Sequence, residues 1–191
     1  MEQTSLSNEE SLKIITDMIS KAKNNMARRG SFYFLLWGWV ILAGNLGYYL
    51  AAKYQWMQTP HLVWLITLPA VIVTIVYGMR QGESNMSAGK LDNIYMNLWA
   101  AIGVALITVL AFSYKLDFNH NAVILLLAAI GTYVTGKLIK FTPFFMGSLG
   151  LWIGAVVAFN LPVLDQYLVG AVAIVVGYLI PGYLLKKEEG E

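Results

Sequence analysis

The stretch that decides the fold is NAVILLLAAIGTYVTGKLI, residues 121–139, in which one lysine near the end carries the only charge. A helix of about 20 apolar residues covers the roughly 30 Å hydrocarbon core of a bilayer. Five further stretches of this chain have similar length and apolarity. We expect transmembrane helices at residues 32–52, 61–79, 93–114, 121–139, 141–160 and 167–185. The predicted fold class is an all-α integral membrane protein, with the six helices joined as three consecutive hairpins.

The composition supports a membrane protein of one compact unit. Of the 191 residues, 58% are hydrophobic and only 13% are charged, against about 25% charged residues in an ordinary soluble domain. The net charge of +2 is too small to indicate binding to nucleic acid. Because the chain has no cysteine, disulfides, thiolate nucleophiles and cysteine metal sites are excluded.

The first thirty residues predict a separate amphipathic helix. Ser7 and Glu10 match a capping box, and apolar residues follow at alternating spacings of three and four, which is one stripe of a helix. The stripe consists of Leu12, Ile15, Ile19, Ala22 and Met26. Basic residues gather near the end of this helix, at Lys21, Lys23, Arg28 and Arg29. We expect the helix to stop at Gly30, which divides the chain into a cytosolic helix (1–30), a six-helix transmembrane domain (31–185) and a short charged cytosolic tail (186–191).

Three different surfaces could pack against this apolar stripe, and the sequence does not choose among them. The first is the lipid headgroup layer, which attracts basic residues by about 1 kcal/mol each. The second is a helix of a partner protein, since the spacing also fits a short coiled-coil seam. The third is the set of inner loops of the same chain.

Lysine and arginine predict the orientation. Cytoplasmic loops of membrane proteins carry an excess of these residues. One side of the predicted topology holds Lys13, Lys21, Lys23, Arg28, Arg29, Arg80, Lys90, Lys137, Lys140, Lys186 and Lys187; the other holds Lys53 and Lys115. We therefore expect a bacterial-type inner membrane protein with both termini in the cytoplasm. The first long apolar run starts only at Phe32, so we expect the N-terminus to be retained rather than removed with a signal peptide.

Few polar residues fall inside the predicted spans. Asn45 and Asn97 need hydrogen-bond partners in hydrocarbon, which indicates helix packing or contact with a solute. Gly150 and Gly154 form a G-x-x-x-G pattern, typical of close packing against a neighbouring span or a second copy of the chain. Pro69 predicts a kink in the second span.

Four residues that could bind a metal ion or respond to pH lie on the outer side of the predicted topology. Two imidazoles and two carboxylates can ligate a divalent metal, and histidine can sense pH. These candidates are His61, Asp117, His120 and Asp165. Their spacing matches no metal motif, and loops at a membrane surface collect such residues by chance, so an ordinary solvated loop is the favoured explanation. The chain has no phosphate-loop, nucleophile-elbow or zinc-protease motif, so we expect no catalytic residue and no cofactor.

A faint repeat runs through the chain. A Leu-Trp pair ends at Trp37, Trp99 and Trp152, in spans one, three and five. Three hairpins of one kind would produce this pattern, as duplication does in repeat proteins. Composition imposed by the bilayer would also produce it.

These observations predict a non-enzymatic membrane protein with a regulatory, sensory or scaffolding role. Its N-terminal helix (8–29) would contact a protein partner or the bilayer. The first alternative is a small-solute transporter or channel that works as a homo-oligomer, and the second is a membrane enzyme that acts on lipid. Intramembrane charges, which transporters commonly use, are missing from the middle of the predicted spans, and this favours the first interpretation.

Overall fold

The structure is a computed structural model that describes residues 8–84 and 90–188, with the backbone alone at some positions in 8–29, 81–84 and 90–92. In the described part of the chain, six helices are long and apolar enough to cross a membrane, which confirms the six predicted spans. They are Gly30–Tyr54, Pro60–Arg80, Asn93–Ala111, His120–Ile139, Thr142–Phe159 and Val163–Glu188. By length and composition, the chain is a multi-pass membrane protein.

All regular elements in the described part of the chain are helical. In chain order they are α1 (Asn8–Tyr54), the 3-10 helix η1 (Pro60–Ile66), α2 (Thr67–Ser84), α3 (Lys90–Ala111), the 3-10 helix η2 (Ser113–Leu116), α4 (His120–Ile139), α5 (Thr142–Phe159), α6 (Val163–Ile174), the π-helix η3 (Val175–Leu179) and α7 (Ile180–Glu188).

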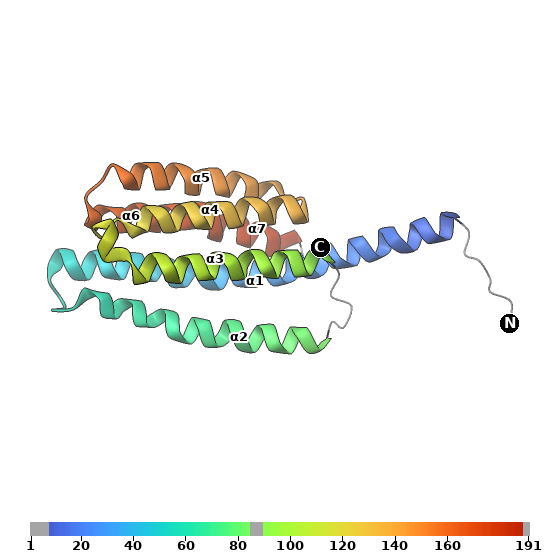
Figure 1. Ribbon diagram of the computed structural model, residues 1–191, viewed down its shortest axis with the longest axis horizontal. Helices are drawn as coiled ribbons and strands as arrows, with labels where there is room; N and C mark the ends of the chain where they lie inside the picture. Colours follow the sequence, from blue (N-terminus) through green and yellow to red (C-terminus); the bar gives the residue numbers. More distant parts are fainter. Residues whose placement is uncertain (1–7, 85–89, 189–191) are drawn as a thin grey trace.

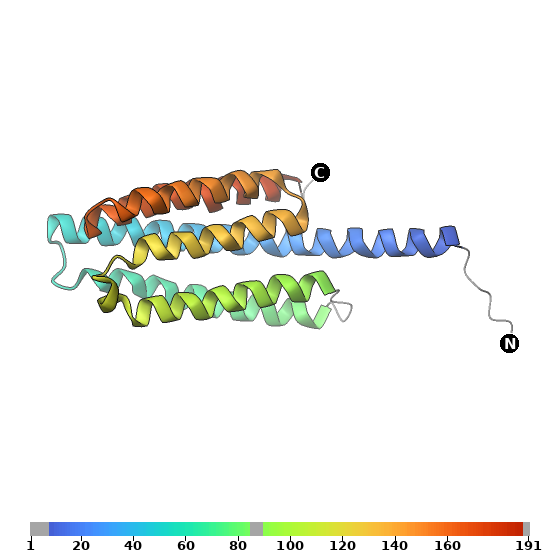
Figure 2. The ribbon, with the colours of Figure 1, turned by 45° about the horizontal axis from the view of Figure 1, so that its top comes forward.

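Four helical rods form the packed centre, and two lie at its edge. The helices α4, α5 and the continuous α6–η3–α7 rod pack on one another, and α1 packs on the last rod and on α4 (Figures 1 and 2). The helix α2 packs mainly on α1, and α3 packs on α4 and α1. The central rods meet around Phe34, Leu125, Phe144 and Leu151, each at most 2% exposed. The edge helices are far less covered, since 6% of the α2 span and 11% of the α3 span are buried, against 44% for α4.

The predicted helix stop at Gly30 is wrong. One helix, α1, runs without a break from Asn8 to Tyr54 over 47 residues. Among the described glycines none has a positive φ, so Gly30 does not adopt the left-handed conformation that ends many helices. Gly30 is instead buried in the helix interior, where a Cβ would lie 3.7 Å from Leu185 of α7. Because glycine keeps its N–H, it costs a helix only about 1 kcal/mol. The helical segments on both sides of Gly30 outweigh this cost, and α1 continues through it.

Two prolines lie beside changes of helix type. The second span begins as the 3-10 helix η1 and becomes α-helical at Thr67, so Pro69 lies in the first turn of α2. Proline is tolerated there, because a first-turn N–H has no acceptor within the helix. In the last span, the π-helix η3 directly precedes α7, whose second residue is Pro181. A proline removes one backbone hydrogen bond, and a π-bulge is one way in which a helix accommodates that loss.

A tryptophan–threonine pair joins the helices of the first two predicted hairpins. Nε1 of Trp37 donates to Oγ1 of Thr74 at 3.1 Å, which links α1 to α2. Nε1 of Trp99 donates to Oγ1 of Thr135 at 3.2 Å, which links α3 to α4. Trp152 of α5 departs from this pattern and contacts the ring of Tyr133 at 5.6 Å. The tryptophan repeat therefore has a structural counterpart in spans one to four.

Removing either threonine hydroxyl is expected to weaken its own helix pair. Thr74→Val and Thr135→Val keep the shape of the side chain but leave the indole N–H without its acceptor. Each should lower the free energy of unfolding by about 0.5–2 kcal/mol, measured as a shift in the unfolding midpoint in detergent. Thr108→Val is the control, because Thr108 is exposed and donates only within its own helix, to the carbonyl of Val104. Equal shifts in all three variants would contradict a specific role for the indole contacts.

Candidate functional site

The N-terminal part of α1 extends well beyond the bundle (Figures 1 and 2). Residues 8–29 continue the axis of the first span, and at 1.5 Å per residue they reach about 33 Å past Gly30. Leu12, Ile14 and Met18 expose 69%, 45% and 64% of their surface. The projecting helix is thus a large surface with apolar side chains that the described part of the chain leaves uncovered.

Most of the predicted stripe falls outside the described side chains. This applies to Ile15, Ile19, Ala22 and Met26, and to the basic residues Lys21, Lys23, Arg28 and Arg29. Leu12 is described, and its carbonyl accepts a hydrogen bond from Oγ1 of Thr16 at 2.8 Å. The backbone there is α-helical, as the stripe requires.

The base of the projecting helix packs against α7. A Cβ at Gly182 would lie 3.1 Å from Leu35 and 3.5 Å from Phe34, so the two helices touch closely. Phe34 also contacts the ring of Tyr178 at 4.8 Å, and Nε1 of Trp39 donates to the hydroxyl of Tyr183 at 3.0 Å. These contacts fix α1, at the point where it leaves the bundle, against η3 and α7.

A network of amide side chains lies at the opposite end of the bundle, between α1, α4 and α6. Nδ2 of Asn121 donates to the backbone carbonyl of Gln166 at 2.9 Å and to Oδ1 of Asn45 at 3.4 Å. Nδ2 of Asn45 donates to the carbonyl of Ile41. Asn45 and Gln166 are 2% and 0% exposed. Gly170 faces this network, because a Cβ there would lie 3.0 Å from Oδ1 of Asn45.

The network continues to the loops. Nε2 of Gln166 donates to Oδ1 of Asn119 at 2.7 Å and to the carbonyl of Leu161 at 3.1 Å. Nε2 of His120 lies 3.4 Å from the hydroxyl of Tyr167, whose ring stacks on Tyr48 at 4.0 Å. Two buried atoms of this region, Oε1 of Gln166 and Nδ1 of His120, have no hydrogen-bond partner among the described residues.

The structure does not assemble the proposed metal candidates. Among the described residues no three His, Asp or Glu side chains lie close enough to hold a metal ion. His120 contacts Tyr167, whereas His61 lies near Tyr48, with ring centroids 6.2 Å apart. Asp117 ends η2 in the left-handed conformation and Asp165 lies in the first turn of α6.

The two asparagines predicted to line a solute path are also apart. Asn45 is buried in the amide network, and Asn97 is exposed on the surface of α3. Thr74 and Thr135 bind the indole groups of Trp37 and Trp99.

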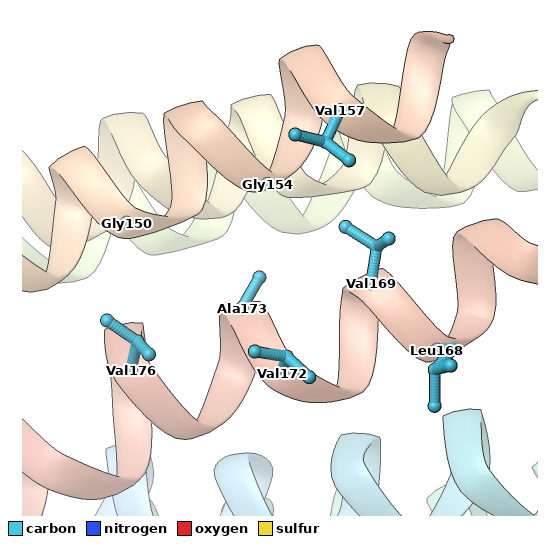
Figure 3. Close-up of a pocket in the computed structure, with 8 residues that line it drawn as sticks. All are labelled: Gly150, Gly154, Val157, Leu168, Val169, Val172, Ala173 and Val176. Atoms are coloured by element: carbon cyan, nitrogen blue, oxygen red, sulfur yellow. The ribbon is translucent and has the colours of Figure 1, made fainter. Parts of the chain in front are cut away.

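The G-x-x-x-G pattern packs within the chain. A Cβ at Gly154 would lie 2.7 Å from Cβ of Ala173, and one at Gly150 would lie 2.6 Å from Val176. Both partners belong to the last span, so these glycines let α5 approach it. A shallow apolar groove of about 360 Å³ runs along this contact, and Figure 3 shows its lining. The lining residues are Gly150, Gly154, Val157, Leu168, Val169, Val172, Ala173 and Val176.

The extent of the amide network differs from the sequence-based prediction. The predicted last span starts at residue 167, which puts Gln166 in a connection, whereas this span starts at Val163 in the structure. Asn119 and Asn121 flank the start of α4, where polar residues normally face water. The available signal was that three amides stand at the same predicted membrane edge.

No protein-family model matches this chain, and no curated protein and no solved structure matches it either. Its function is therefore inferred from its own residues and their arrangement.

Proposed function

We propose that this chain is a non-enzymatic membrane subunit with a regulatory or scaffolding role, whose projecting helix (8–29) binds a helix of a partner protein. The observation that carries the proposal is the unbroken α1, in which the first membrane span continues straight into an uncovered helix. A rigid connection of this kind couples a contact outside the bilayer to the bundle.

The basic residues support a cytoplasmic position for this helix. The end of the bundle from which α1 projects holds the end of α2, the start of α3, the end of α4 and the end of α7 (Figure 1). In sequence, these helix ends contain or adjoin Arg80, Lys90, Lys137, Lys140, Lys186 and Lys187. Lys53 and Lys115 lie at the other end. By the positive-inside rule, we place both termini in the cytoplasm of a bacterial-type inner membrane.

Geometry favours a protein partner over the headgroup layer. A bilayer is about 40–45 Å thick with its headgroups and about 30 Å without them, so each headgroup layer adds only about 5–8 Å. A helix that continues the axis of a span leaves this layer after about five residues. Most of the stripe, from Leu12 to Ala22, then lies in water. An apolar stripe in water is stabilised by burial against another helix.

The wider arrangement proposed here is three consecutive hairpins with an amphipathic helix in front. The matching Trp37–Thr74 and Trp99–Thr135 hydrogen bonds support two hairpins of one kind. Spacing of the apolar residues between Leu12 and Met26 supports the amphipathic helix.

The proposal is tested by purification in mild detergent from the native cell. Four forms are compared: the full chain, a form lacking residues 2–29, Ile15→Lys with Ile19→Lys, and Ser20→Lys with Asn24→Lys. The last pair is the matched control, since it adds the same charge at the same spacing on the face away from the stripe. We expect a stoichiometric partner with the full chain and the control, and none with the deletion. The stripe variant should bind about a hundredfold more weakly or worse, because each lysine places an unpaired charge at an apolar contact.

A partner retained by the stripe variant would contradict this assignment. A lone homo-oligomer in all four preparations would overturn it and favour the alternative, small-solute transport by an oligomer. The observation behind that alternative is the pair of unpartnered buried atoms, one in Gln166 and one in His120. Flux of solutes into vesicles would then be measured for the native chain and for variants of these two residues.

A further inference from the structure

The last span keeps one side on α1 along most of its length. Phe34 and Asn45 are eleven residues apart in the unbroken α1, and at about 100° per residue they lie on the same side of it. Phe34 contacts α7, since a Cβ at Gly182 would lie 3.5 Å from its Cβ. Asn45 contacts α6, since a Cβ at Gly170 would lie 3.0 Å from its Oδ1. Gly170 and Gly182 therefore face the same way.

A regular α-helix would not bring these two glycines to one side. They are twelve residues apart, which in an α-helix leaves them about 120° out of line. The π-helix η3 (Val175–Leu179) lies between them, and a π turn holds about one residue more than an α turn. One additional residue removes about 100° of the difference. The π-helix thus allows α6 and α7 to pack on α1 together.

Pro181 favours the π form. In a regular α-helix its ring would clash with the carbonyl of Gly177, four residues earlier. In the structure this carbonyl contacts α5, where it would lie 3.0 Å from a Cβ at Gly147, and Cγ of Pro181 would lie 3.2 Å from the same Cβ. π-Helices are rare, and single π turns within α-helices occur frequently at functional sites. The α form is the regular alternative for this segment once the proline is replaced.

In the α form, α7 would turn by one position. The helix α6 would stay in place, because Nδ2 of Asn121 donates to the carbonyl of Gln166 at 2.9 Å. Pro181 would then take the place of Gly182 against Leu35. A Cβ alone at Gly182 would already lie 3.1 Å from that leucine, so the larger proline ring would push α7 and α1 apart.

We propose that η3 is a register switch of the last span. In its π form, α7 holds the base of the projecting helix through the contact of Gly182 with Leu35. The hydrogen bond from Trp39 to Tyr183, at 3.0 Å, belongs to the same form. In its α form, α7 turns by one residue, both contacts are lost and the base of α1 is released. A partner that prefers one direction of residues 8–29 selects one form, a step that rests on the proposed function.

Disulfide formation reports the register, because the chain has no cysteine. The π pair is Leu35→Cys with Gly182→Cys, since a Cβ at Gly182 would lie 3.3 Å from Cγ of Leu35, the position that a cysteine sulfur takes. The α pair is Leu35→Cys with Pro181→Cys, because Pro181 faces α5 in the structure and meets Leu35 only after the turn. The control pair is Gly47→Cys with Val63→Cys, whose Cβ atoms lie 3.8 Å apart, as a disulfide requires. Each pair is oxidised in vesicles that contain the purified protein alone.

We expect the π pair to cross-link, and Pro181→Ala to slow it at least about threefold. Pro69→Ala is the matched control and should leave the rate unchanged, because Pro69 lies in the first turn of α2. The α pair should also cross-link. Deletion of Val176, the exposed member of η3, removes the additional residue and leaves α7 in its present register. This deletion should restore the π pair in the Pro181→Ala chain and abolish the α pair.

Equal rates of the π pair with and without Pro181→Ala, or an α pair that does not cross-link, would overturn the proposal. A deletion of Val176 that does not restore the π pair would overturn it too. Loss of the control cross-link in any variant has the same meaning, because a chain that only changes register keeps its fold. No partner is present in these vesicles, so failure of the switch and failure of the partner proposal are distinguishable.

Discussion

Gly177→Ala is expected to destabilise the protein by about 1–3 kcal/mol, although the same change usually strengthens a helix. A Cβ at Gly177 would overlap Cγ of Leu151 and lie 2.7 and 2.8 Å from its two methyl carbons. Leu151 is 0% exposed, so it has no free space into which to move. Overfilling a packed core by one methyl group costs about this amount. The unfolding midpoint in detergent measures the effect.

Gly103→Ala is the matched control for this prediction. No atom in the described part of the chain lies within 4 Å of a Cβ at Gly103, and replacing a helical glycine by alanine gains up to about 1 kcal/mol. The two variants should therefore shift the midpoint in opposite directions. In a Leu151→Ala background, Gly177→Ala should cost much less, because the clashing side chain is gone. Identical shifts at Gly177 and Gly103 would show that the close approach of α5 to η3 is not needed.

Asn121→Leu is expected to remove the centre of the amide network and to lower the free energy of unfolding by about 1–3 kcal/mol. Its amide joins α4 to the carbonyl of Gln166 and to Oδ1 of Asn45. Leucine has a similar volume but no donor, so both acceptors stay buried without this partner. A buried group left unsatisfied costs about 1–3 kcal/mol. Chemical or thermal unfolding of the detergent-solubilised protein measures the loss.

Asn160→Leu is the matched control for Asn121→Leu. Asn160 is exposed at the end of α5, and its side chain donates only to the carbonyl of Val156, within its own helix. Exposed substitutions of this kind stay within about 0.5 kcal/mol. If Asn121→Leu proved as harmless as Asn160→Leu, the network would be dispensable for stability, and the contacts between α1, α4 and α6 would rest on apolar packing alone.

Local sequence rules failed in this chain where packing changed their context. Gly30 has the composition of a helix stop, yet α7 packs against it and α1 continues. Pro69 looks central in an apolar run, but the 3-10 helix before it places it in a first turn. In both cases the residue type was interpreted correctly and its position within the final helix was not.

The candidate site was also only partly predictable from the sequence. The projecting surface was predictable, because the spacing from Leu12 to Met26 is a property of the chain alone. Its direction was not, since that depends on whether the helix breaks at Gly30. The amide network joins Asn45, Asn121 and Gln166, which are far apart along the chain, and no periodicity indicates such a contact.

The sequence by itself determined that this protein crosses a membrane and where its six spans lie, because a bilayer requires about 20 consecutive apolar residues in each helix. That requirement is local and can be read from one segment at a time. Only the tertiary structure decided which helices form the centre and which remain at the edge. In hydrocarbon every span is apolar on all sides, so hydrophobicity does not distinguish a packed face from one that faces lipid. The distinction comes from small residues and hydrogen bonds that meet across helices, as Gly154 meets Ala173 and Asn121 meets Asn45.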